Sequence, residues 1–148
     1  MKNTGIFKKV LVAVDGSEHS DRAVTYGIQL TRQNKCKLYF LYVIDQKIIE
    51  SYKILKKDSN KIRDELSEKG HVILSRIKKL AVKNEIPVET KMLVGIPYQR
   101  ILDYSQELNV DLIIIGHEST QRPWTSHHVG STAKHIIEYM KCPILLVN

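Results

Sequence analysis

Residues 111–147 read DLIIIGHESTQRPWTSHHVGSTAKHIIEYMKCPILLV, and the order of apolar and polar residues in them indicates how the chain folds. A short apolar run, Leu112 to Ile115, ends at Gly116, and a polar loop leads to Gly130-Ser131-Thr132, where a helical pattern begins. Glycine permits close backbone approach, and the first turn of a helix offers unpaired N–H groups with a partial positive charge. The arrangement therefore suits a phosphate group, although Gly116 could simply end a strand and Ser131 could simply begin a helix.

Three more apolar runs and a mixed segment, Val88 to Val94, complete the pattern, and helical periodicity lies between successive segments. Because the runs are continuous rather than alternating, they are typical of parallel strands that are buried on both faces. The alternation predicts an α/β fold with an open five-stranded parallel sheet and helices on both faces. The predicted strands are Val10–Val14, Lys37–Val43, Val88–Val94, Leu112–Ile115 and Ile144–Val147.

Composition narrows the class of protein. A length of 148 residues suits one domain, residues 1–148, with a single core. No apolar run is long enough to cross a bilayer and the N-terminus does not resemble a signal peptide, so we expect a cytoplasmic protein with no membrane partner. The net charge of +7 weakly favours anionic ligands. Cys36 and Cys142 lack metal or redox spacing and are expected to be small buried hydrophobic residues.

The charged part of the chain lies between residues 46 and 91, where twelve Lys or Arg residues face seven Asp or Glu residues. Within it, residues 59–83 are predicted to form a long helix in which Gly70 is a weak point. Residues 45–57 are predicted to be a mobile loop or a short helix, whose lysines and Tyr52 either contact a ligand or partner or form a solvated surface. The predicted buried stripe of the long helix is Ile62, Leu66, Ile73, Ile77 and Leu80.

The candidate site is expected where the strands end, because open parallel sheets bind ligands outside the carboxyl ends of their strands. Asp15-Gly16-Ser17 follows the first strand, Val43 and Ile44 end the second, and Gly116 follows the fourth. If the first and fourth strands are neighbours, Asp15 and Gly116 face one crevice. Asp15 could then bond a ribose or hold a metal beside phosphates, or it could simply form an Asp-Gly turn.

Five motifs, distributed in order along the chain, resemble the universal stress protein family. They are VAVDGS at 12–17, GIP at 95–97, DLIIIGH at 111–117, GSTA at 130–133 and CPILLV at 142–147. The resemblance implies a five-stranded parallel sheet in the order 3-2-1-4-5. It also implies a homodimer paired through the last strand, Ile144 to Val147.

Family members that bind ATP share a glycine pattern: Gly, two residues, Gly, nine residues, then Gly-Ser or Gly-Thr. Gly116 and Gly130-Ser131 fit this pattern, but Ser119 stands where the second glycine is expected, and ten residues follow it instead of nine. Ser119 loses free access to positive φ, although its hydroxyl could bond a phosphate oxygen. Retained Asp15 favours a nucleotide site, whereas the two departures leave a nucleotide-independent dimeric interaction module of the same family as the alternative.

The resemblance further implies roles for individual residues in holding ATP, with Mg²⁺ as a plausible companion. Val14 and Asp15 would contact adenine and ribose, and Val43 would pack on the adenine or serve only the core. Backbone and hydroxyl groups of Gly116, Gly130, Ser131 and Thr132 would approach the ribose and phosphates, and Ile115 and Ser119 complete the candidate set. The implied protein is a stress-response switch with at most slow hydrolysis, because no nucleophile motif, P-loop or GxGxxG is present and no catalytic residue is assigned.

Residues 120–128 hold further candidates. Arg122 could pair with a phosphate oxygen and Trp124 could stack or mediate dimer contacts, or both could belong to an exposed loop. His117, His127 and His128 match no familiar zinc spacing, so no metal site is assigned. Nucleic acid is not expected as a partner, because no recognition motif or interleaved aromatic residues accompany the basic segment.

Overall fold

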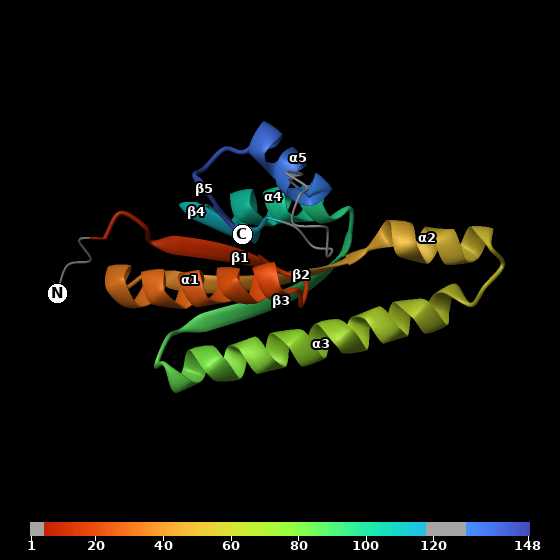
Figure 1. Ribbon diagram of the computed structural model, residues 1–148, viewed down its shortest axis with the longest axis horizontal. Helices are drawn as coiled ribbons and strands as arrows, with labels where there is room; N and C mark the ends of the chain where they lie inside the picture. Colours follow the sequence, from red (N-terminus) through yellow and green to blue (C-terminus); the bar gives the residue numbers. More distant parts are fainter. Residues whose placement is uncertain (1–4, 118–129) are drawn as a thin grey trace.

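The computed structural model describes residues 5–117 and 130–148, which form a twisted parallel sheet covered by helices (Figure 1). The sheet has five strands in the order β3-β2-β1-β4-β5. Both the predicted α/β class and the implied strand order are confirmed. The strands are β1 Lys9–Val14, β2 Lys37–Asp45, β3 Val88–Gly95, β4 Leu112–Gly116 and β5 Ile144–Val147. The helices are α1 Glu18–Asn34, α2 Gln46–Ile54, α3 Ser59–Lys83, α4 Pro97–Leu108 and α5 Ser131–Tyr139.

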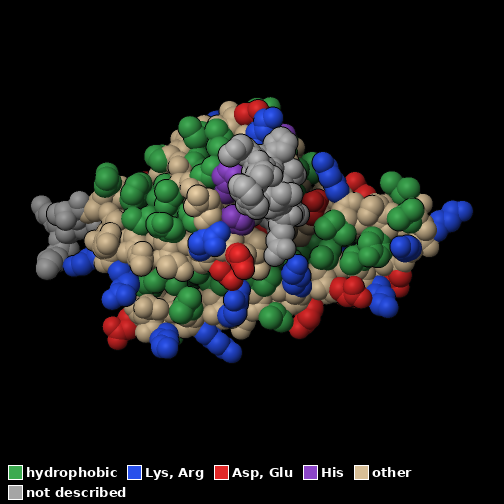
Figure 2. Space-filling view, in the orientation of Figure 1, with side chains coloured by type: hydrophobic (Ala, Val, Ile, Leu, Met, Phe, Trp, Pro, Cys, Tyr) green, Lys and Arg blue, Asp and Glu red, His purple; other side chains and the backbone are tan. Residues whose placement is uncertain are grey.

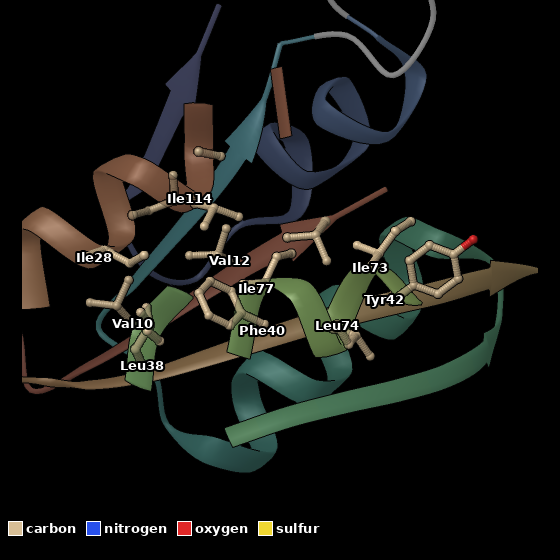
Figure 3. Packing of buried hydrophobic residues seen from close by; sticks show 14 of the residues in the cluster. Val10, Val12, Ile28, Leu38, Phe40, Tyr42, Ile73, Leu74, Ile77 and Ile114 are labelled. Carbon is tan, nitrogen blue, oxygen red and sulfur yellow. The ribbon is translucent and has the colours of Figure 1, made fainter. Parts of the chain in front are cut away.

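The sheet separates two hydrophobic clusters because successive side chains of a strand point to opposite faces. Val10, Val12 and Phe40 pack with residues of α1 and α3 on one face (Figure 3). Leu11 and Ile113 pack with residues of α4 and α5 on the other face. Strands β1 and β4 are therefore buried on both sides, which explains their unbroken apolar runs.

Helix α3 lies against β2 and β3 through Gly70, and this contact changes the interpretation of that glycine. A Cβ at Gly70 would lie 2.6 Å from Tyr42 Cδ1 and 2.7 Å from Met92 Sδ. The residue that helical propensity marks as a weak point is thus the residue that allows close helix–sheet packing.

The predicted buried stripe of α3 is correct at Ile73 and Ile77 and wrong at Leu80, whose surface is 44% exposed. Ala81, fully buried, takes the sheet-facing position instead, because residue i+4 follows Ile77 around the helix more closely than residue i+3. Ile62 and Leu66 are partly buried.

The segment between β2 and α3 forms the short helix α2, which was one of the two predicted alternatives. Helices α2 and α3 make a helical hairpin that projects beyond the carboxyl ends of the strands (Figure 1). Among the described residues, no helix is both long and apolar enough to span a membrane. Cys36 is buried, as expected, and Cys142 is partly buried.

Candidate functional site

The turn after β1 fixes the position of Asp15. Gly16 has a φ of +86°, a conformation that glycine adopts readily, so the chain can reverse directly into α1. One carboxylate oxygen of Asp15 accepts the N–H of Ser17 at 2.9 Å, and the N–H of Asp15 donates to Ser20 Oγ at 3.1 Å. Asp15 is exposed, so its second carboxylate oxygen can accept a hydrogen bond from a ligand.

Gly116, at the end of β4, is a packing residue. A Cβ at this position would lie 2.8 Å from His19 Cβ and 3.1 Å from the backbone nitrogen of Ser20. The missing side chain therefore lets β4 approach the first turn of α1. Gly116, the first glycine of the ATP-binding pattern, is therefore needed for the contact between β4 and α1 and lies at the end of its strand.

Gly130 immediately precedes α5 and is joined to the end of β4. Its N–H donates to the carbonyl of His117 at 3.0 Å, and the N–H of His117 donates to the carbonyl of Val147 at 2.6 Å. No side chain among residues 5–117 and 130–148 caps the start of α5. The backbone N–H groups of the first turn, from Ser131 onward, are therefore available to an anionic group.

These turns open on a shared cavity of about 440 Å³ at the carboxyl ends of β1, β2 and β4. A cavity of this size falls within the range of small-molecule sites. Ser119 lies outside the described residues. The candidate residues that line the cavity are Val14, Asp15, Val43, Ile115, Gly116, Gly130, Ser131 and Thr132.

The cavity has further walls that the sequence did not predict. Asp45 ends β2 much as Asp15 follows β1, and one of its carboxylate oxygens accepts the N–H of Lys47 at 2.9 Å. An aspartate directly after an apolar run could have indicated this position. Leu66 and Lys69 reach the cavity from α3, and Ile48 reaches it from α2, where no local pattern distinguishes them.

The cavity lining combines carboxylates, the ammonium group of Lys69 and backbone N–H donors. Asp15 and Asp45 place carboxylates beside the ends of β1 and β2, whereas the uncapped turn of α5 offers N–H groups. Burial raises the pKa of Tyr42, and the negative charge of Asp15 raises it further. Such a cavity suits a ligand that combines neutral hydrogen-bond donors with negative charge.

The histidines do not assemble a metal site in the part of the chain that is described. His117 lines the cavity, while His127 and His128 lie outside the described residues, as do Arg122 and Trp124. Within residues 5–117 and 130–148, no three His, Cys, Asp or Glu side chains are placed to hold a metal ion.

Comparison with known proteins decides the family. The profile of the universal stress protein family matches residues 6–148. The chain belongs to this family. A universal stress protein of Methanocaldococcus jannaschii is 28% identical over 146 residues, which cover 97% of this chain and 83% of the relative. A universal stress protein of Bacillus subtilis is 26% identical, with 97% of this chain and 100% of the relative covered.

Solved structures share the same architecture, and two of those compared below are universal stress proteins. The hypothetical protein MJ0577 superposes with a TM-score of 0.83 at 25% identity, with 96% of each chain covered. A universal stress protein solved in complex with cAMP has a TM-score of 0.68 at 20% identity, covering 96% of this chain and 97% of its own. The Archaeoglobus fulgidus protein solved with dAMP has a TM-score of 0.64 at 21% identity, covering 97% and 99%.

Proposed function

We propose that this universal stress protein binds an adenine nucleotide, ATP with Mg²⁺, in the cavity at the carboxyl ends of β1, β2 and β4. The observation that carries the proposal is the convergence of Asp15, Gly116 and Gly130–Thr132 on one cavity of about 440 Å³. These residues are far apart in the sequence, and each has a group that suits a different part of a nucleotide. The proposed roles remain those that the family resemblance implies.

The polar groups of the cavity orient the ligand. Phosphates lie against the first turn of α5, where the N–H groups and the helix dipole favour negative charge. Asp15 accepts a hydrogen bond from a ribose hydroxyl, because its carboxylate would repel a phosphate. The base lies near Val14 and Val43, both of which line the cavity.

Adenine is the proposed base because two solved proteins of this fold are complexes with adenine nucleotides, cAMP and dAMP. The proposed protein is a cytoplasmic stress-response switch that pairs into a homodimer and hydrolyses ATP at most slowly. Binding rather than turnover is proposed because the sequence has no nucleophile motif, P-loop or GxGxxG.

The site is tested by calorimetric titration of the wild type and of Gly130→Asp with ATP in the presence of Mg²⁺. This substitution puts bulk and a negative charge where the phosphates are proposed to lie, so binding should be abolished. Ser75→Asp is the matched control, because it adds the same charge at an exposed position of α3 outside the cavity, and it should bind ATP like the wild type. Equal ATP binding by Gly130→Asp and the wild type would show that the site is wrongly assigned.

Ser119 and the extra loop residue favour the second candidate, a nucleotide-independent dimeric interaction module. Native mass spectrometry of freshly purified protein discriminates between the two candidates, because it reports subunit mass and any carried nucleotide together. A dimer that carries no nucleotide and gives no heat with ATP would support the interaction module.

A further inference from the structure

The connection between α2 and α3 presents two large apolar side chains to solvent. Ile54 is 80% exposed and Leu55 is 62% exposed, although they are neighbours at the end of a projecting hairpin. We call residues 53–57 together with Lys61 the hairpin tip. Its apolar pair contributes nothing to either hydrophobic cluster of the sheet, so the fold by itself gives no reason for both residues to be apolar.

Hydrogen bonds hold the hairpin tip in an ordered turn. The N–H of Lys57 donates to the carbonyl of Tyr52 at 2.8 Å, and the N–H of Lys56 donates to the carbonyl of Lys53 at 3.1 Å. Lys56 has a φ of 55°, so these bonds form a Schellman motif with lysine where glycine is usual. Docking such a turn requires little additional ordering, because its backbone is already fixed.

The side chain of Asp58 completes the tip by accepting the N–H of Lys61 at 3.1 Å and capping α3. The Nζ of Lys57 lies 5.7 Å from the ring centroid of Tyr52. In a Schellman motif, the residues at these two positions usually make a hydrophobic contact. The two helices therefore leave the tip in fixed directions, and Ile54 and Leu55 stay on its outer surface.

Lysines outnumber acidic residues next to the apolar pair, although Glu50 and Asp58 are also exposed there. Between Lys47 and Arg63 the chain has six basic and two acidic residues. Lys53, Lys56, Lys57 and Lys61 are all exposed, and the ion pairs found among the described residues involve none of them. Figure 2 shows hydrophobic, basic and acidic side chains next to each other over the projecting end of α2 and α3.

We propose that the hairpin tip docks on the anionic surface of a lipid bilayer. A convex tip that has an apolar pair within a group of lysines matches an interface where acyl chains lie just below anionic headgroups. A nucleic acid would satisfy the lysines but leave Ile54 and Leu55 against sugar and phosphate. The sequence led us to expect no membrane partner, chiefly because it has no segment that could span a bilayer. Contact of the exposed hairpin tip with the bilayer surface needs no such segment, so we replace that expectation with peripheral binding.

Co-sedimentation with vesicles tests the proposal. The full chain should bind vesicles of phosphatidylcholine mixed with phosphatidylglycerol and should not bind vesicles of phosphatidylcholine alone. High salt should release it, because exposed charges are screened. Replacing Lys53, Lys56 and Lys57 by Gln should weaken binding by roughly fivefold for each lysine. The double variant Ile54→Gln with Leu55→Gln should weaken binding by about tenfold or more.

Matched controls separate the tip from the general positive charge of the protein. Lys78, Lys79 and Lys83 lie toward the other end of α3, and Gln at all three should leave vesicle binding within about twofold of the wild type, because charges beyond a Debye length are screened. Val72→Gln with Val82→Gln controls for exposed apolar residues of the same helix. Thermal melting should show every variant folded, since all of these side chains are exposed.

Leu55→Trp in a Trp124→Phe background reports insertion directly, because the introduced indole is then the only one in the chain. Its emission should shift to shorter wavelength when anionic vesicles are added. The proposal is overturned if the wild type does not bind anionic vesicles, if both lysine triples lower binding equally, or if the introduced tryptophan shows no shift. Binding to DNA or an acidic protein with no vesicle binding would also overturn it.

Discussion

At the scale of single residues, Gly70 lies in close contact with the sheet. Tyr42 and Met92 occupy the space that a side chain would need, with separations of 2.6 and 2.7 Å from a Cβ. The same residue lowers the intrinsic helical propensity of α3 by about 1 kcal/mol relative to alanine. For a substitution of Gly70 by alanine, packing therefore predicts a loss of stability and helical propensity predicts a gain.

Gly70→Ala should destabilise the protein by about 1–3 kcal/mol, because overpacking of a buried contact outweighs the gain in propensity. Urea unfolding followed by circular dichroism measures the change. Ser75→Ala on the exposed side of α3 is the control and should be neutral or slightly stabilising. A Gly70→Ala protein more stable than the wild type would contradict the packing seen at this contact.

Tyr42 links the core to the cavity and gives a prediction about pH. Its pKa is raised by burial and then by the charge of Asp15, so the neutral phenol is favoured in the folded state. The resulting stabilisation is fully present below the unfolded tyrosine pKa of about 10, and it is lost as pH rises through the folded pKa. Stability should therefore fall above about pH 10, where the phenol of the unfolded chain begins to ionise.

Tyr42→Phe should lose less stability than the wild type between pH 8 and pH 11, because phenylalanine has no proton to release above about pH 10. Urea unfolding at several pH values in this interval gives the comparison. Tyr52→Phe, at a half-buried position of α2, serves as the control for removing a phenol elsewhere. Parallel stability curves for Tyr42→Phe and the wild type would disprove this contribution.

At the scale of elements, β5 is the apolar edge of the sheet. The carbonyls of Pro143 and Val147 accept the N–H groups of Ile113 and His117, so these residues face β4. Backbone groups alternate in a parallel strand, and the polar groups of Ile144 and Leu146 therefore point to the outer edge. An uncharged edge of this kind can pair with another strand, in agreement with the proposed homodimer.

Leu146→Pro should convert the proposed dimer to a monomer while the fold is kept, because proline removes an outward N–H and is tolerated on an edge strand. Size-exclusion chromatography with light scattering reports the mass. Leu145→Pro removes an N–H on the β4 side instead and should destabilise the fold itself. A Leu146→Pro protein that remains dimeric, or a monomeric wild type, would exclude pairing through β5.

At the scale of the whole molecule, the cavity exists only when distant elements are assembled. Its lining combines the ends of β1, β2 and β4 with the starts of α4 and α5, the first turn of α2 and the middle of α3. A ligand in this cavity therefore contacts segments from most of the chain. Binding should couple to global unfolding rather than to one local element.

ATP with Mg²⁺ at about a hundred times its dissociation constant should stabilise the folded state by about 2.7 kcal/mol and raise the melting temperature by about 5–10 °C. Differential scanning calorimetry measures the shift. Gly130→Asp should show no shift, and GTP at the same concentration should give a smaller one if adenine is recognised. A melting temperature that does not depend on ATP would argue for the nucleotide-independent alternative.

The sequence alone determined the elements and their class. Continuous apolar runs such as Val10–Val14 specify strands buried on both faces, and Gly16 and Gly130 mark turns next to such elements. These features are readable because hydrogen bonding within an element and the face that it buries depend on near neighbours. The family motifs added the strand order, which local periodicity does not encode.

Only the tertiary structure decided which side chains meet. It places the missing side chain of Gly116 against α1, Gly70 against Tyr42, and Asp45 and Lys69 on the wall of the same cavity as Asp15. It also leaves Ile54 and Leu55 exposed although their residue types favour burial. These relations depend on how elements far apart in the sequence cross and pack, and a periodic pattern within one element has no information about the element that it will contact.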